Sequence, residues 1–171
     1  MIEQTMLIAG TQCPASNGAT FDRLNPLDGS VATRAPAATI EDAIRACESA
    51  AAAFPAWSQL GPSARRAMLM KASQALEAKG EAIAAAMAAE TGASGIWAGF
   101  NVHLAAGMLL EAASLTTQIN GEIIPSDIPG SVAMAVRQPA GVVLGIAPWN
   151  AHMIITMHSI STALAYGNTV I

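Results

Sequence analysis

The sequence predicts an α/β protein, in which a mainly helical part precedes the start of a parallel sheet. Apolar residues recur at helical spacing through much of 39–118. A short continuous apolar run, Gly141–Ala147, is typical of a strand that is buried on both faces of a parallel sheet. An apolar helix over 151–165 and a new strand at 169–171 come after this run. The order strand, helix, strand indicates a βαβ unit, which is right-handed by strong preference.

The composition excludes several classes of protein. The 171 residues are 53% hydrophobic, but alanine supplies much of this, and no stretch reaches the roughly 18 uninterrupted apolar residues of a membrane span. The net charge of -4 and the lack of a basic stripe argue against nucleic acid as a partner. The first residues do not form an export signal, and Cys13 and Cys47 lack metal-ligand spacing. We expect no metal, no membrane partner and a cytoplasmic location.

The first part of the chain, Met6 to Arg34, is rich in glycine, asparagine, aspartate and proline, which favours short strands joined by turns. A strand at Leu7–Ala9 precedes a turn at Gly10-Thr11. Further turns are predicted at Asn25-Pro26 and at Asp28-Gly29.

A first helix is predicted to begin at Thr39, because Asp42 three residues later completes a variant of the capping box. We expect this helix to end near Phe54-Pro55. Four residues form its apolar stripe: Ile40, Ile44, Cys47 and Ala51. Cys47 is therefore predicted to be a buried, inert thiol.

Three more helices are predicted over 63–80, 81–91 and 94–118. Ser63 is the expected N-cap of the second helix, and Gly92 is expected to end the third. The buried face of the second helix is expected to hold Leu69, Ala72 and Leu76. The fourth helix carries a stripe that is more often core than binding site: Trp97, Phe100, Leu104 and Met108.

Two strands, Gly121–Asp127 and Ser131–Gln138, are predicted next, joined by a turn at Ile128–Gly130. Three residues of the second strand share one face of it: Val132, Met134 and Val136.

Asn150 is the candidate catalytic residue, because it comes directly after the buried strand and opens a helix. Ligands bind to α/β sheets at the carboxyl ends of the strands, where a helix N-terminus also offers free N–H groups. An asparagine there could donate a hydrogen bond to a developing oxyanion. From spacing alone the commoner role of such an asparagine is that of an N-cap, and the two roles are compatible. Trp149 could belong to the core or line the same crevice, and His103 and His158 are expected to be structural.

The motifs around Asn150 resemble those of the aldehyde dehydrogenase superfamily. The family's R-x-P-x-G-V pattern is matched by Arg137–Val143, and its P-W-N pattern lies within Ile146–Asn150. The segments that follow in the family are matched, at the same spacing, by Ala163–Ala165 and Gly167–Val170. The order of upstream elements fits as well, so the resemblance covers nearly the whole chain. One branch of the family, the salicylaldehyde and vanillin dehydrogenases, acts on aromatic aldehydes. Its sequences are similar to this one at Gly92-Ala93-Ser94 and at residues 97–102.

This resemblance implies an oxidoreductase that transfers a hydride from an aldehyde to NAD or NADP. In the family, a cysteine attacks the aldehyde to give a thiohemiacetal, and a glutamate-activated water hydrolyses the resulting thioester. Asn150 matches the family's oxyanion asparagine. The main chain of Ala147, Pro148 and Trp149 would lie along the cofactor near its nicotinamide. Six residues fall at substrate-pocket positions: Trp97, Phe100, Leu104, Ile154, Ile155 and His158.

The resemblance also predicts the organisation of the chain. Residues 1–120 would be the N-terminal hairpin and helical part of the cofactor-binding domain, 121–139 an oligomerisation arm, and 140–171 the first βαβ unit of a Rossmann-like sheet. The whole enzyme would form a homo-dimer or homo-tetramer. His152 departs from the family, since many members have proline there.

The chain also lacks the family's cofactor lysine, phosphate-binding glycines, catalytic glutamate and nucleophilic cysteine. It is therefore expected to be an N-terminal fragment that is inactive alone. Two alternatives are a non-catalytic binding or assembly remnant of the same scaffold, and a semialdehyde-forming reductase of activated carboxylates. The Pro-Trp-Asn turn and its flanks weigh against the reductase.

Overall fold

The computed structural model describes all residues of the chain, 1–171. The helices are α1 (Ile40–Ser58), α2 (Pro62–Ala78), α3 (Gly80–Thr91), α4 (Gly95–Leu115) and α5 (His152–Ala165). The strands are β1 (Ile2–Glu3), β2 (Met6–Ile8), β3 (Thr11–Cys13), β4 (Thr20–Leu24), β5 (Val31–Pro36), β6 (Glu122–Ile124), β7 (Ala133–Ala135), β8 (Val142–Val143) and β9 (Thr169–Val170). The predicted α/β class is confirmed.

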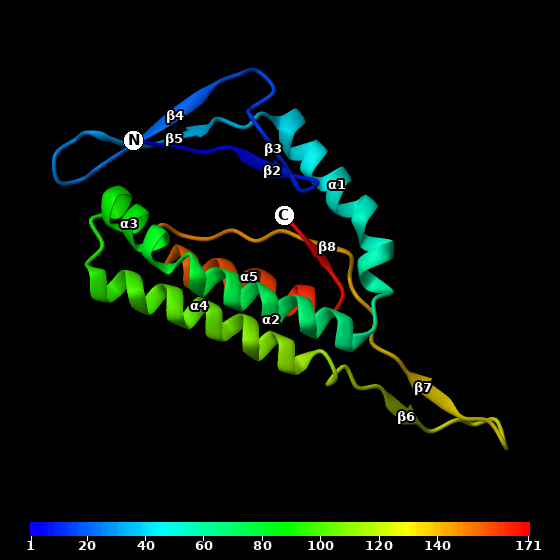
Figure 1. Cartoon of the computed structure of the whole chain (residues 1–171). Coiled ribbons are helices and arrows are strands. Elements are labelled where there is room, and N and C mark those ends of the chain that lie inside the picture. The colour runs from blue at the N-terminus through cyan, green and yellow to red at the C-terminus, as the bar shows by residue number, and fades with distance from the viewer.

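The helices α2, α4 and α5 lie side by side and form the body of the structure (Figure 1). The N-terminal strands lie beyond the helices, and α1 runs from these strands to the end of the bundle (Figure 1). The centre of the core is a cluster of small and aliphatic residues: Leu69, Leu109, Ala112, Ala113 and Ala165. Because alanine side chains are short, they let the backbones of neighbouring helices approach closely.

Helix α4 is long and apolar enough to cross a membrane by length and composition alone. It packs instead against α2, α3 and α5, and its buried residues include Ala98, Val102 and Leu109. The core helices of many proteins pass the same test of composition, so the hydropathy of α4 is explained by its place in the bundle.

The capping box of α1 is confirmed, but its predicted end and its predicted buried face are wrong. The helix continues through Pro55 to Ser58, and the indole N–H of Trp57 donates to the carbonyl oxygen of Leu164 at 3.1 Å, which fixes the last turn. The stripe that includes Ile40, Ile44 and Cys47 faces solvent. The opposite side of α1, which carries Ala46 and Ala50, faces β9, so the Cys47 thiol is exposed rather than buried.

The boundaries of the next helices agree with the predicted signals within a few residues. Gly61 rather than Ser63 is the N-cap of α2, and Pro62 takes the first helical position, where its missing N–H has no cost. Ser73 is buried in place of the predicted Ala72, and its hydroxyl donates to the carbonyl oxygen of Ala106 at 2.9 Å. Gly92 ends α3 in the left-handed conformation, with φ of 68°, as predicted.

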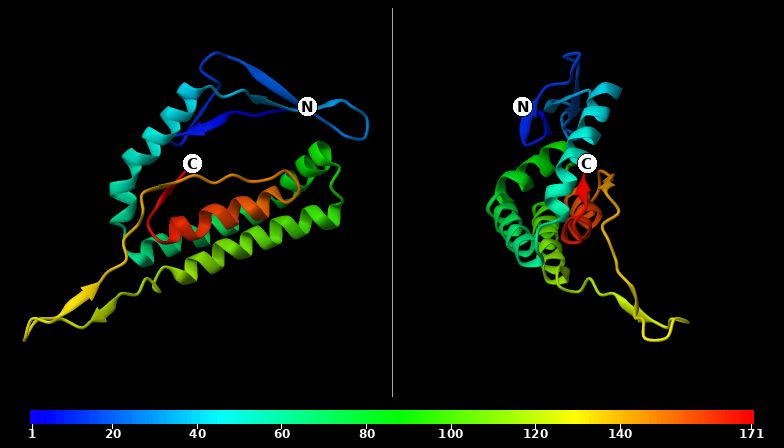
Figure 2. Two further views of the ribbon diagram at one scale, coloured as in Figure 1. Left: turned by 180° about the vertical axis from the view of Figure 1, so that it is seen from behind. Right: turned by 90° about the vertical axis from the view of Figure 1, so that its right-hand side faces the viewer.

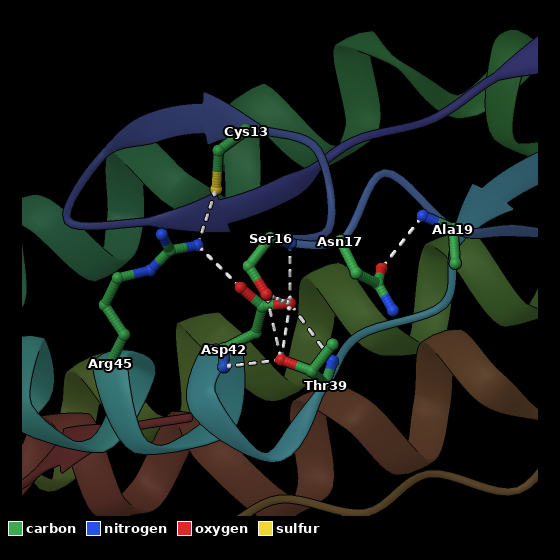
Figure 3. A network of polar contacts seen from close by, with 7 residues as sticks. All are labelled: Cys13, Ser16, Asn17, Ala19, Thr39, Asp42 and Arg45. Atoms are coloured by element: carbon green, nitrogen blue, oxygen red, sulfur yellow. Dashed lines mark hydrogen bonds and ion pairs between the residues drawn. The ribbon is translucent and has the colours of Figure 1, made fainter.

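The N-terminal strands form a three-stranded sheet of order β1-β5-β4 and a separate hairpin of β2 and β3. The β2–β3 turn has positive φ at Ala9 and Gly10, as a two-residue type I′ turn requires. A polar network fastens this region to α1 (Figure 3). In it, the carboxylate of Asp42 accepts hydrogen bonds from the backbone N–H groups of Thr39 and Ser16, both at 3.0 Å.

Strands β8 and β9 are parallel and α5 connects them, which confirms the predicted βαβ unit. The predicted strand over Gly141–Ala147 is shorter than expected, since only Val142 and Val143 are paired in register. One further backbone bond joins Gly145 N–H to Ile171 O at 2.8 Å. Strand β8 has a neighbour on one side only, and Leu144 and Ile146, which follow its paired residues, are exposed in this chain rather than buried on both faces.

The predicted hairpin is present as β6 and β7, which pair antiparallel with Ile123 opposite Met134, but both strands are shorter than predicted, at three residues each. It projects away from the helical body in every view (Figures 1 and 2). The predicted face of Val132, Met134 and Val136 is exposed to solvent.

Candidate active site

The candidate site is the turn between β8 and α5, which contains Ala147, Pro148, Trp149 and Asn150. These four residues are exposed, and Trp149 retains 68% of its accessible surface. Trp149 therefore lies at the surface of the crevice and not in the core. The turn is located where a ligand of an α/β sheet is expected, at the carboxyl end of a parallel strand and the start of a helix.

The N-cap role of Asn150 is excluded by the backbone. Ala151 occupies the N-cap position of α5, with φ of -137° and ψ of 44°, and no side chain caps the helix. The Asn150 side chain is exposed and stays available for hydrogen bonds to a bound molecule. The geometry leaves the Asn150 amide free for the other predicted role, donation to a developing oxyanion.

Two aromatic side chains hold the turn through its main-chain carbonyl groups. The indole N–H of Trp97, in the first turn of α4, donates to the carbonyl oxygen of Asn150 at 3.0 Å. The Nδ1 atom of His152 lies 3.0 Å from the carbonyl oxygen of Trp149. The turn is thus attached both to α4 and to the first residue of its own helix.

The six predicted pocket residues are not equally accessible. Trp97 and Phe100 are 41% and 48% exposed, so the prediction that their stripe is core is wrong. Their rings stack with centroids 5.6 Å apart and planes inclined by 24°. Leu104 and Ile155 are half-buried and His158 is exposed, whereas Ile154 keeps only 8% of its surface and packs inside the chain.

A cavity of about 280 Å³ adjoins the turn on the side of the N-terminal sheet. Besides the residues of the turn and His152, it is lined by Arg23, Glu90 and Thr91. No sequence pattern marks these three residues as part of a site, because they come from β4 and from the end of α3. The Glu90 carboxylate accepts a hydrogen bond from the hydroxyl of Thr33, which joins α3 to β5.

The larger cavity, about 540 Å³, is an apolar groove between α1, β2 and β9 and does not include Asn150. The chain contains no group of three or more histidine, cysteine, aspartate or glutamate side chains that could hold a metal ion. His103 and His158 are both exposed and lie on different helices. Both cysteines are free thiols, and neither is in the turn.

A parallel βαβ unit with an exposed asparagine at its strand-to-helix turn is the arrangement that the sequence resemblance predicts. A family model described as "Aldehyde dehydrogenase family" matches residues 14–171, and the chain belongs to this family.

Individual relatives point to one branch of the family. The chain is 57% identical over its whole length to a vanillin dehydrogenase of Pseudomonas fluorescens, of which it covers 35%. It is 44% identical to a salicylaldehyde dehydrogenase of Pseudomonas putida, over 92% of the chain and 32% of that protein.

Solved structures agree with the sequence relatives. A crystal structure of a salicylaldehyde dehydrogenase from Pseudomonas putida G7, complexed with salicylaldehyde, has a TM-score of 0.96 and 41% identity over 99% of this chain and 35% of its own. The crystal structure of PnpE in complex with nicotinamide adenine dinucleotide has a TM-score of 0.93 and 34% identity, over 98% of this chain and 34% of its own. The chain therefore spans about 35% of the length of the relatives that it matches.

Proposed function

We propose that the full-length protein containing this chain oxidises an aromatic aldehyde to its carboxylate with NAD or NADP. Membership of the aldehyde dehydrogenase family supports the reaction, and the identity to vanillin and salicylaldehyde dehydrogenases supports an aromatic substrate. The observation that carries the proposal is the exposed Asn150 side chain on the turn between β8 and α5.

Asn150 is the proposed oxyanion donor. As an attacking cysteine converts the aldehyde carbonyl to a tetrahedral centre, negative charge develops on the carbonyl oxygen. The side-chain amide of Asn150 would donate a hydrogen bond to this oxygen, which stabilises the charged state more than the neutral aldehyde. The cysteine and the water-activating glutamate would come from residues outside this chain.

Residues Ala147, Pro148 and Trp149 would hold the nicotinamide end of the cofactor. Their exposed backbone and the flat apolar surfaces of Pro148 and Trp149 fit a planar ring. The cofactor supplies the acceptor for the hydride that leaves the substrate carbon. The role of the turn is to orient this ring beside Asn150, so that the hydride acceptor and the oxyanion donor face one substrate.

The substrate ring would lie against a wall formed by two helices. On α4 the stacked Trp97 and Phe100 offer aromatic surface, with Leu104 one turn further along. On α5 the accessible candidates are Ile155 and His158, and the buried Ile154 would support the wall from behind. An apolar wall with an aromatic pair suits a planar aldehyde better than a small hydrophilic one.

We also propose that the β6–β7 hairpin, within residues 121–139, is an arm through which a homo-dimer or homo-tetramer forms. Its exposed apolar side chains, such as Ile123, Val132 and Met134, support an interface at this place. Residues 1–120 and 140–171 would together belong to the cofactor-binding domain. A cytoplasmic location is proposed because Cys13 and Cys47 are free thiols.

The test uses the full-length protein, with NAD or NADP and with vanillin, salicylaldehyde and benzaldehyde as substrates. We expect NADH or NADPH formation, and we expect Asn150→Ala to lower kcat by about 10²–10³-fold, the loss typical of an oxyanion donor. Cofactor affinity, measured by calorimetry, should remain within about twofold, because only the side chain is removed.

The matched control is Asn17→Ala. Asn17 is an exposed asparagine whose side chain accepts a hydrogen bond from Ala19 N–H in an N-terminal turn. This variant should keep wild-type kcat. An Asn150→Ala enzyme with wild-type kcat would refute the oxyanion role, and a full-length protein that oxidises none of the aldehydes would refute the proposed reaction.

A further inference from the structure

The turn that carries Asn150 lacks the restraints that normally fix the start of a helix. Ala151 cannot cap α5, and the first N–H groups of this helix have no side-chain acceptor. All residues from Ala147 to Asn150 are exposed in this chain, so packing within the chain contributes little to their position. The direction of the Asn150 side chain must therefore depend on the few polar contacts that hold its backbone.

The contact that reaches Asn150 itself comes from Trp97. Its indole N–H donates to the carbonyl oxygen of Asn150 at 3.0 Å, across 53 residues of sequence. This carbonyl belongs to the same residue as the proposed oxyanion donor, so the bond constrains the peptide plane next to the Asn150 α-carbon. The contact from His152 reaches the preceding carbonyl, that of Trp149, and arises within the same segment.

Trp97 is itself well fixed, which a positioning residue requires. Its backbone N–H donates to the hydroxyl of the N-cap Ser94 at 3.2 Å. Its carbonyl oxygen accepts from the side-chain amide of Asn101 at 3.0 Å, and Asn101 is fully buried. The indole also stacks on Phe100. Trp97 is thus held by the cap of α4, by a buried amide and by an aromatic neighbour, while its N–H points to the turn.

We infer that Trp97 is a positioning residue that acts through Asn150: its indole N–H fixes the backbone from which the Asn150 side chain reaches the oxyanion. This inference rests on the proposed function of Asn150. It is separate from any contact between the tryptophan ring and the substrate, since the hydrogen bond uses the edge of the indole. The two contributions can be separated, because phenylalanine keeps an aromatic face and removes the N–H group.

The experiment compares Trp97→Phe with the wild-type full-length enzyme. Without this hydrogen bond, the backbone of Asn150 is less firmly held, and kcat should fall by about tenfold. A small displacement of a group that acts in the transition state slows the reaction strongly. The KM for the aldehyde and the affinity for the cofactor should change by less than about twofold, because the aromatic wall remains.

Trp57→Phe is the matched control. Trp57 also donates its indole N–H to a main-chain carbonyl oxygen, that of Leu164 at 3.1 Å, but at the opposite end of α5. It should lower the melting temperature and leave kcat unchanged. If Trp57→Phe reduces kcat as much as Trp97→Phe does, the effect is one of general stability and the inference is wrong.

A double-mutant cycle with Asn150→Ala decides whether Trp97 acts through Asn150. If it does, adding Trp97→Phe to Asn150→Ala has no further effect on kcat. If the loss of kcat in the double variant is the product of the two single losses, Trp97 acts on the substrate directly, and the inference is overturned. An active wild-type enzyme with an unaffected Trp97→Phe variant would also overturn it, whereas an inactive wild-type protein would mean that the proposed function itself is wrong.

Discussion

The carboxylate of Asp42 accepts a hydrogen bond from the backbone N–H of Ser16 at 3.0 Å, although 26 residues separate the two in sequence. The same carboxylate caps α1 through Thr39 N–H and pairs with Arg45 at 2.9 Å (Figure 3). One buried side chain therefore both starts a helix and fastens the segment after the β2–β3 hairpin to it.

The first prediction concerns pH. The backbone N–H groups of Thr39 and Ser16 hold the pKa of Asp42 below its usual range. A carboxyl whose pKa is lower in the folded state stabilises the protein above its unfolded pKa, and this contribution is lost as the pH falls through the folded pKa. We expect the unfolding midpoint in urea to decrease from about pH 5 downwards.

In the Asp42→Asn variant, the urea unfolding midpoint should depend less on pH over this range and should be lower at neutral pH. Part of the dependence of the midpoint on pH will remain, because Arg34 also lowers the pKa of Asp22. Asp127→Asn, a change at an exposed position of the β6–β7 hairpin, is the control. An Asp42→Asn protein with the full acid sensitivity of the wild type would contradict this assignment.

A second prediction concerns the β2–β3 turn. Ala9 has φ of 54°, a left-handed conformation that alanine adopts at a cost. Asparagine tolerates it better and precedes glycine in the preferred type I′ turn. Ala9→Asn should therefore stabilise the protein by about 0.5–1 kcal/mol in thermal or urea unfolding. Gly10→Ala, at φ of 74°, should destabilise it, and the opposite order would show that this turn is not of type I′.

A third prediction concerns the core. Leu69 is buried with Leu109 and three alanines where α2, α4 and α5 meet. Leu69→Ala should destabilise the protein by about 2–5 kcal/mol, because a cavity remains between helices that are already closely packed. Leu27→Ala is the comparison, since Leu27 is 83% exposed and its loss should change the unfolding midpoint very little.

A fourth prediction concerns His152, the first residue of α5. Proline lacks only an N–H that has no partner within the helix, although the preceding Ala151, at ψ of 44°, would have to become more extended. His152→Pro removes the ring contact to the Trp149 carbonyl and also restricts the backbone. We expect kcat within about threefold of wild type and stability within about 0.5 kcal/mol. A loss as large as that of Asn150→Ala would mean that the ring contact of His152 is essential.

A fifth prediction concerns the proposed arm. A Cβ atom at Gly121 would lie 2.5 Å from the carbonyl oxygen of Ala135, and backbone cannot move aside as a flexible side chain can. Gly121→Ala should displace β6 from β7 and shift the full-length protein to a smaller oligomer in light scattering. Gly107→Ala on α4 is the control, because nothing lies within 4 Å of its Cβ position.

Elements with local determinants could be predicted from the sequence. The Thr39–Asp42 capping box and the left-handed Gly92 depend on neighbours within a few residues, and both are present as expected. The β6–β7 hairpin was also predictable, since turn residues separate two short strands. The βαβ unit could be inferred from the change in apolar spacing around Gly141–Ala147.

Features that depend on tertiary contacts could not be predicted. The apolar stripe of α1 faces solvent and its alanine face lies toward β9, and periodicity cannot distinguish two such faces. The Asn150 side chain was identified, but the Trp97 contact that holds its backbone joins residues 53 positions apart. No spacing rule brings these residues together, and only the packing of α4 beside α5 does.

The bond between Trp97 and Asn150 also has a consequence for the order of folding. It closes a chain loop of 53 residues, and the entropic cost of such closure rises with loop length. The β6–β7 hairpin lies within this loop and depends only on local contacts, so it can form within about 1–10 μs and shorten the chain that remains to be closed. The two halves of the site therefore meet only when this long loop closes, and the hairpin within the loop can influence that step although it contributes no residue to the site.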